Sequence, residues 1–155
     1  MGTNLVRIRK AKREDTPLIL EMIKGIAEYE LLLDKVEANV ITLEKELFDE
    51  GSASVIFASV GKLTVGFALY FYNFSTFKGR KGLYLEDLFV IPKYRKQGIG
   101  KQLFEYLIKE AKQKECGRME WVCLNWNTSA IDFYRKKKAI SMDEWITFRL
   151  DEKVF

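Results

Sequence analysis

Residues 82–91, with the sequence GLYLEDLFVI, constrain the fold of this 155-residue chain more than any other stretch. Apolar side chains occur at both odd and even positions, so a strand formed here presents apolar groups to both faces of a sheet. Such a strand belongs at the centre of a sheet that is covered on both faces. The stretch ends at Pro92, which lacks a backbone donor. We therefore expect a central sheet flanked by helices.

Alternation of apolar and polar residues, together with β-branched and aromatic composition, predicts the other strands. Gly61-Lys62 is a two-residue hairpin signal between two of them. These strands are predicted at residues 5–9, 54–60, 63–74, 118–124 and 145–150.

Apolar residues at helical spacing predict four helices. Asp15 and Thr16 before Pro17 begin the first, and Asn127 is the expected N-cap of the last. The helices are predicted at residues 15–33, 42–51, 98–114 and 128–138. The order of elements indicates one α/β (α+β) domain spanning residues 1–155, with a mixed sheet.

Composition excludes several kinds of site and partner. The chain has no histidine, which removes imidazole bases and the commonest zinc sites, so we expect no metal. The net charge of +4 suits an anionic ligand but is small for a nucleic-acid-binding protein, so we expect no nucleic acid. We also expect a cytoplasmic protein that does not enter a membrane, because no apolar run approaches about 20 residues and no signal peptide is apparent. Cys116 and Cys123 are then free thiols.

The segment YRKQGIGKQL (94–103) follows the central strand and opens a helix. Gly98 and Gly100 lack a Cβ, so an anion can approach their backbone closely. Amides at a helix start have no partners within the helix and lie at the positive end of its dipole. An anion site is one interpretation, and a glycine turn with solvated lysines is the other.

Glu86 and Asp87 interrupt the otherwise apolar central strand. Adjacent strand residues point to opposite faces, so the two carboxylates are not expected side by side. Burying them is unfavourable unless they are paired or used. They are either functional or an ionic or capped pair at a bend in the sheet.

Two motifs follow one another along the chain: Arg95-x-x-Gly98-x-Gly100 after a buried strand, and Asn127-x-x-Ala130-x-x-Phe133-Tyr134. Their order is the one found in the GNAT superfamily of acyl-CoA N-acetyltransferases, which the chain resembles along nearly its whole length. The resemblance is closest to the diamine (spermidine/spermine) branch and its thialysine-acetylating relatives. The segments that carry it are AEYE (27–30), STFKGR (75–80), YLEDLFV (84–90) and WN…DFYR (126–135).

This resemblance implies a GNAT fold with a mixed, mostly antiparallel sheet, acetyl-CoA as co-substrate, and a homodimer. It implies direct attack of a small primary amine, such as a polyamine, a diamine or a lysine-like or thialysine-like amino acid, on the thioester in a ternary complex. The implied cofactor-binding residues are Leu88, Phe89, Val90, Arg95, Lys96, Gln97, Gly98, Ile99, Gly100, Lys101, Glu120, Trp121, Val122, Asn127, Thr128, Ser129, Ala130 and Tyr134. The implied amine-binding residues are Tyr29, Glu30, Glu86 and Asp87.

Two residues receive catalytic roles through this resemblance. Without histidine, a carboxylate is the available base for an ammonium substrate, and Glu86 is the candidate. Tyr134 matches the family tyrosine that protonates the departing thiolate, and a phenol is a competent donor for that step. Ordinary core packing is the alternative for Tyr134.

Two positions depart from the family pattern. Lys138 stands where the superfamily usually has glycine, and the loop Ser75-Thr76-Phe77 lacks the acidic residue and tryptophan of the polyamine enzymes. The loop puts long polyamines in doubt as substrates. A protein Lys or N-terminal acetyltransferase and a non-enzymatic acyl-CoA-binding module remain the alternative functions.

Overall fold

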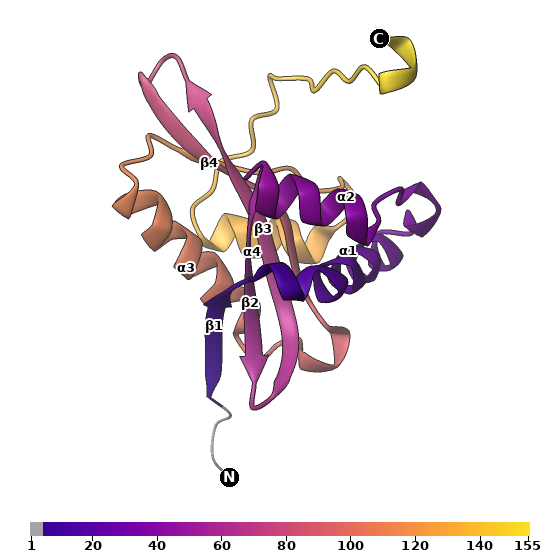
Figure 1. The fold of residues 1–155 in the computed structure, drawn as a ribbon. Helices are drawn as coiled ribbons and strands as arrows, with labels where there is room; N and C mark the ends of the chain where they lie inside the picture. The colour runs from indigo at the N-terminus through magenta and orange to yellow at the C-terminus, as the bar shows by residue number, and fades with distance from the viewer. Residues whose placement is uncertain (1–4) are drawn as a thin grey trace. The chain divides into compact units, whose positions relative to one another are not determined.

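A computed structural model describes residues 5–155 of the chain (Figure 1). The chain divides into two compact units, Met1–Val122 and Cys123–Phe155. Among the described residues, the first unit contains the sheet and three α-helices, and the second contains one α-helix and a 3₁₀ turn at Glu152–Val154.

The sheet of the first unit has five strands in the order β1-β2-β3-β4-β5. Their bounds are Val6–Lys10 (β1), Ser54–Val60 (β2), Leu63–Ser75 (β3), Arg80–Val90 (β4) and Met119–Glu120 (β5). The first three pairings are antiparallel, and β5 runs parallel to β4. This is the mixed, mostly antiparallel sheet that was expected.

Helices lie on both faces of this sheet (Figure 1). They are α1 (Thr16–Tyr29), α2 (Val40–Glu44), which continues as a π-helical turn at Lys45–Asp49, and α3 (Ile99–Gln113). Short 3₁₀ turns occur at Arg13–Asp15, Leu33–Lys35 and Pro92–Tyr94. Within residues 5–155, none of the helices combines the length and the apolar character needed to cross a bilayer.

The core has two layers, one on each side of the sheet. On the α1 side, Ile19 and Met22 pack with Phe57, Phe67 and Phe89. On the other side, α3 buries Ile99, Leu103 and Leu107. The contact between α3 and the sheet is so close at Gly66 that a Cβ there would lie 3.3 Å from Leu103 Cδ1. Residues 82–91 form most of β4, which has α1 on one face and α3 on the other, as predicted, but β4 is the fourth of the five strands and not the central one.

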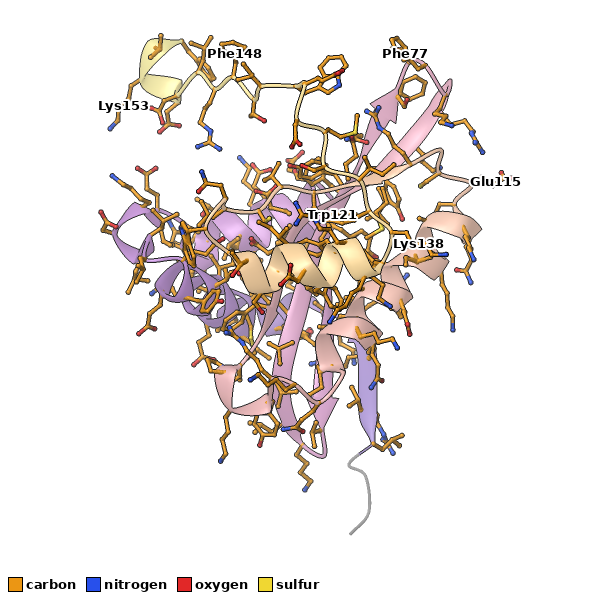
Figure 2. The ribbon with its side chains drawn as sticks, turned by 180° about the vertical axis from the view of Figure 1, so that it is seen from behind. Phe77, Glu115, Trp121, Lys138, Phe148 and Lys153 are labelled. Atoms are coloured by element: carbon orange, nitrogen blue, oxygen red, sulfur yellow. The ribbon has the colours of Figure 1, made fainter. Side chains whose placement is uncertain are left out.

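Two predicted strands are largely absent. The strand expected at 118–124 is reduced to Met119–Glu120, because β5 pairs with β4 only at Leu83 and Tyr84, just before β4 changes register. The strand expected at 145–150 is wrong, since the structure has no regular element there. Its alternating side chains have no neighbouring strand within Cys123–Phe155, and Phe148 is 90% exposed (Figure 2).

In the second unit, α4 (Thr128–Lys136) begins and ends with recognisable caps. The Asn127 side chain accepts a hydrogen bond of 3.3 Å from the amide of Ala130, which confirms the predicted N-cap. At the other end, the amide of Ala139 donates to the carbonyl of Tyr134, and that of Lys138 donates to Arg135. These two bonds form a Schellman motif.

Three helices end in this motif with a residue other than glycine in the left-handed position. These residues are Leu31, Glu115 and Lys138, with φ of 61°, 55° and 67°; Glu115 and Lys138 are labelled in Figure 2. Lys138 therefore occupies a conformation that favours glycine, which explains why the family usually has glycine there. The same geometry ends α1 at Tyr29 rather than at the predicted Leu33.

Candidate active site

The loop between β4 and α3 presents backbone amides rather than side chains. Gly98 precedes the helix in the left-handed region, with φ of 80°, and Lys96 also has a positive φ of 62°. Within residues 5–155, no hydrogen bond uses the amides of residues 96–101 as donors, and no side chain caps α3. Successive amides near left-handed residues at a helix start form a concave anion site.

Arg95 attaches this loop to the sheet and to α1. Its Nε donates a 2.9 Å hydrogen bond to the carbonyl of Val90. Its guanidinium lies 4.3 Å from the ring centroid of Tyr29 and 5.5 Å from that of Phe89. Both are cation–π distances. Arg95 therefore holds the strand end, the loop and the end of α1 together, a role that the sequence motif did not reveal.

The lysines of the loop are solvated, as the turn interpretation expected. Lys96 is exposed, and Lys101 Nζ lies 4.0 Å from Glu105 Oε1 one turn along α3. Surface ion pairs of this kind contribute little to stability. The loop is thus both a turn with solvated lysines and a cradle of unpaired amides, and its anion-binding capacity resides in the backbone.

A β-bulge at Glu86 brings the two acidic residues of β4 to the same region. Asp87 pairs with Leu69 of β3, whereas Leu85 pairs with Tyr70, so Glu86 is the extra residue between them. Paired residues share a face, which puts Asp87 on the face of Leu69, toward α1. The prediction that Glu86 and Asp87 point to opposite faces assumed unbroken alternation, and the alternation is interrupted at this bulge.

The electrostatics of the carboxylates follow from this geometry. Burial, followed by the negative charges of Glu86 and Glu30, raises the pKa of Asp87 to about 6. Burial likewise raises the pKa of Glu30. Glu30, Glu86 and Asp87 therefore form one acidic cluster between the end of α1 and the bulge of β4.

None of the ion pairs found within residues 5–155 involves this acidic cluster. The ionic-pair alternative for Glu86 and Asp87 is therefore not supported. Three carboxylates that lack a protein cation, one of them partly buried, suit a cationic ligand.

The outer edge of β4 is available for pairing beyond Tyr84. There β5 has ended, and residues 85–90 have no strand partner on that side within residues 5–155. An extended ligand can add to such an edge through main-chain hydrogen bonds. Alternate residues present their backbone groups to this edge: Phe89 is hydrogen-bonded toward Phe67 of β3, whereas Leu88 and Val90 face outward. The carbonyl of Val90 already accepts from Arg95, so Leu88 and the amide of Val90 are the accessible groups.

The remaining predicted residues divide between the two units. In the first, Glu120 pairs with Arg118 at 3.1 Å, and Trp121 meets Phe104 edge to face at 5.2 Å between ring centroids. Trp121, which follows β5 in the sequence, is labelled in Figure 2. Residues 127–130 and Tyr134 belong to the second unit, where residues 127–130 cap and open α4 and Tyr134 lies in its last turns.

Comparison with known proteins agrees with these features. The model of the acetyltransferase (GNAT) family matches residues 19–138. The chain belongs to the GNAT acetyltransferase family.

Individual relatives give the same result. A thialysine N-epsilon-acetyltransferase from Bos taurus is 36% identical, with 94% of this chain and 92% of the relative covered. Spermidine/spermine N(1)-acetyltransferase-like protein 1 from Homo sapiens is 33% identical over 95% of this chain, which matches 23% of that longer protein. An integron cassette protein from the mobile metagenome of V.cholerae has a TM-score of 0.80 at 28% identity, covering 99% of this chain and 96% of that one. The resemblance inferred from the motifs is confirmed.

As a GNAT family member, the protein is an acyl-CoA N-acetyltransferase that uses acetyl-CoA as co-substrate. The loop before α3 and the edge of β4 have the chemical groups that acetyl-CoA requires. Unpaired amides at the start of α3 are appropriate for a pyrophosphate, and the unpaired edge of β4 for an extended amide-containing arm.

The raised pKa of Asp87 predicts a pH-dependent stability difference. The folded-state pKa of about 6 exceeds the ordinary value of 3.8, so the folded protein holds this proton more tightly than the unfolded chain does. Stability from this group is present below about pH 4 and is lost as the pH rises to about 6. Asp87→Asn removes this loss. The difference in free energy of unfolding between the variant and the parent protein should therefore be on the order of 2–3 kcal/mol more favourable to the variant at pH 7 than at pH 4.

Urea unfolding at the two pH values measures this gain. Asp34→Asn, at an exposed aspartate, is the matched control and should show an equal difference from the parent at both. If Asp87→Asn also differs from the parent by the same amount at both values, Asp87 does not have a raised pKa.

Proposed function

We propose that the protein transfers the acetyl group of acetyl-CoA to a primary amine of a small molecule, with a lysine-like or thialysine-like amino acid or a short diamine as substrate. The observation that carries this proposal is the acidic cluster of Glu30, Glu86 and Asp87, which lacks a protein cation within residues 5–155. An ammonium group is the natural partner of such a cluster. The name of the Bos taurus relative, thialysine N-epsilon-acetyltransferase, supports an amine of this size.

The cofactor is held mainly by backbone groups in this proposal. The amides of residues 96–101 bind the pyrophosphate, and the β4 edge at 88–90 binds the pantetheine arm. Arg95 keeps the loop in place through Val90 and Tyr29. Residues 120–122, 127–130 and Tyr134 are the further cofactor positions, and they rest on the family motif.

The reaction proceeds by direct attack in a ternary complex. The ammonium substrate loses a proton to Glu86, directly or through water, because only the neutral amine has a free electron pair. Its nitrogen then bonds to the thioester carbonyl carbon, whose oxygen is polarised by backbone amides of β4. The C–S bond breaks, the nitrogen releases its second proton to solvent so that a neutral amide forms, and the thiolate takes a proton from Tyr134, whose phenolate regains one from solvent. Asp87, whose pKa is raised by burial and then by the charge of Glu86, helps to bind the ammonium.

The loop between β3 and β4 favours amino acids over long polyamines. The two strands form a hairpin with Phe77 at its tip, 95% exposed (Figure 2). The adjoining charged side chains of this hairpin, Lys78, Arg80 and Lys81, are basic and would repel the distal ammonium of a long polyamine. The sequence supplies no acidic residue in this loop to offset them.

An amine panel tests the proposed activity. Thiol release from acetyl-CoA should depend on added amine. The kcat/KM for thialysine or L-lysine should be roughly tenfold or more above that for spermidine or for a lysine-containing peptide, a difference of about 1.4 kcal/mol or more in transition-state binding. Tyr134→Phe should lower kcat, and Tyr106→Phe serves as the control. No amine-dependent release with any compound would refute the activity, and a peptide as best substrate would indicate a protein acetyltransferase.

A second test addresses the pyrophosphate loop. At Gly98 a Cβ would meet no atom within 4 Å, but φ of +80° is strained for a β-branched residue. Gly98→Val should therefore displace the amides and weaken CoA binding roughly tenfold or more, whereas Lys96→Ala removes one solvated charge and should weaken it about two- to threefold.

Isothermal titration with CoA measures both effects. Gly51→Val is the matched control, because Gly51 also has a positive φ, +67°, and no atom within 4 Å of an added Cβ. It should lower stability without changing CoA affinity. A larger effect from Lys96→Ala than from Gly98→Val would mean that the lysine side chain, and not the backbone, binds the anion.

We also propose that the two units act together as one acetyltransferase domain in a cytoplasmic homodimer. The free thiols Cys116 and Cys123 are appropriate to a reducing compartment. The apolar side chains exposed in the second unit, including Trp145 and Phe148, suit burial against a second copy.

Light scattering should report a two-chain particle for the parent protein. The double change Trp145→Lys and Phe148→Lys should convert it to single chains, whereas Leu63→Lys, at an exposed apolar residue of the first unit, should have no effect. A single-chain parent protein would contradict the dimer.

A further inference from the structure

A polar cavity lies in the first unit, and none of the three carboxylates of the acidic cluster lines it. It has a volume of about 250 Å³ and is lined by residues of β1, the π-helical turn after α2, β2, β3 and α3. None of the residues assigned above to acetyl-CoA or to the amine substrate lines it. Its size suits a small metabolite better than a cofactor.

The central polar group of this cavity is Glu110 of α3. The residue is only 8% exposed, yet its carboxylate accepts one hydrogen bond, of 3.2 Å, from the hydroxyl of Tyr72. A carboxylate has about four acceptor positions. No ion pair within residues 5–155 involves Glu110. A buried carboxylate of this kind is unfavourable without a cation, so the geometry favours a positively charged ligand group.

Two tyrosines of β3 complete the polar end of the cavity. Tyr70 and Tyr72 meet edge to face, with their ring centroids 6.2 Å apart. Burial and then the charge of Glu110 raise the pKa of Tyr70 to about 12 and also raise the pKa of Tyr72. Both hydroxyls therefore stay protonated at neutral pH. A carboxylate beside an uncharged aromatic ring is a favourable environment for an ammonium group. Lys81 Nζ lies 5.8 Å from the ring centroid of Tyr72, so a ligand ammonium is better placed between Glu110 and the ring of Tyr70.

The other lining residues indicate the rest of the ligand. Leu47, Phe48 and Val55 supply apolar surface that can cover methylene groups. The exposed Lys10 and Lys114 also line the cavity. Their charges repel a second ammonium and attract a carboxylate. A diamine is disfavoured, and a molecule with one ammonium and one carboxylate is favoured.

We propose that this cavity is a second ligand site that binds a small zwitterionic amino acid, with its ammonium at Glu110 and Tyr70 and its carboxylate at Lys10 and Lys114. The site does not depend on the acetyl-transfer mechanism. Its occupancy is measured by binding, whereas the proposed activity is measured by turnover, so the failure of one is distinguishable from the failure of the other.

The experiment is a titration of the intact protein with 5-aminopentanoate, followed by heteronuclear NMR. The amides of residues 53–55, 70–72 and 110–114 should shift in a saturable manner. Pentylamine, which lacks the carboxylate, should bind roughly tenfold more weakly, and pentanoate, which lacks the ammonium, should not shift these amides. Shifts confined to the surroundings of Glu30 and Asp87 would overturn the proposal, because the amine would then bind only at the candidate active site.

Substitutions identify the groups responsible. Glu110→Gln keeps the size of the side chain and an acceptor for Tyr72 but removes the charge, and it should weaken 5-aminopentanoate binding roughly tenfold or more. Glu115→Gln, at an exposed position near the end of the same helix, is the matched control and should leave binding unchanged.

A double change, Lys10→Ala with Lys114→Ala, should remove the preference for 5-aminopentanoate over pentylamine. Circular dichroism on heating verifies that each variant is folded. Unchanged binding in folded Glu110→Gln would overturn the proposal, as would an undiminished preference for 5-aminopentanoate after the lysine changes.

Discussion

The bulge at Glu86 is the constraint on which the candidate site depends. Before it, β4 directs Leu83 and Leu85 to the face that carries Tyr70; after it, Asp87 and Phe89 lie on the α1 face. One extra residue therefore brings a carboxylate toward the end of α1, where Glu30 lies, while the strand remains part of a continuous sheet. Bulges bend the strand that carries them. The pairing of β5 with β4 accordingly ends at Tyr84, which leaves the β4 edge at 85–90 without a strand partner in the described part of the chain.

Arg95 makes these features mutually dependent. It donates to the carbonyl of Val90 at the end of β4 and stacks on Tyr29 beside Glu30. The loop of unpaired amides begins at the next residue. A change that displaces the end of α1 is thus expected to move the anion loop as well, because one guanidinium contacts both. Arginine suits this role better than lysine, since its planar group can stack and donate at the same time.

Much of the fold could be predicted from the sequence because its signals are local. Hydrophobic periodicity located β1 to β4 and the helices, and the glycine motif located the start of α3. The end of α1 was less predictable, because Leu31 occupies a left-handed position without the glycine that usually marks a helix end. The strand at 145–150 failed for a different reason: alternation describes a strand's side chains, but a strand also needs a neighbour to pair with, and the second unit has none within the residues described.

For the candidate site, residue types could be predicted but their arrangement could not. The acidic pair in β4 was identified because two carboxylates are unfavourable in an otherwise apolar strand. The bulge at this pair was not predicted, because strict alternation along the strand was assumed. The stacking of Arg95 and the partial burial of Glu110 depend on contacts between segments distant in sequence.

The difference between the two polar regions is one of charge balance, visible only once the chain is folded. The acidic cluster has three carboxylates and suits a substrate with a net positive charge. The cavity at Glu110 has one carboxylate and two lysines and suits a ligand that carries both charges and whose net charge is zero. A net charge of +4 for the chain indicates neither environment, because recognition depends on the few charges that share a desolvated site.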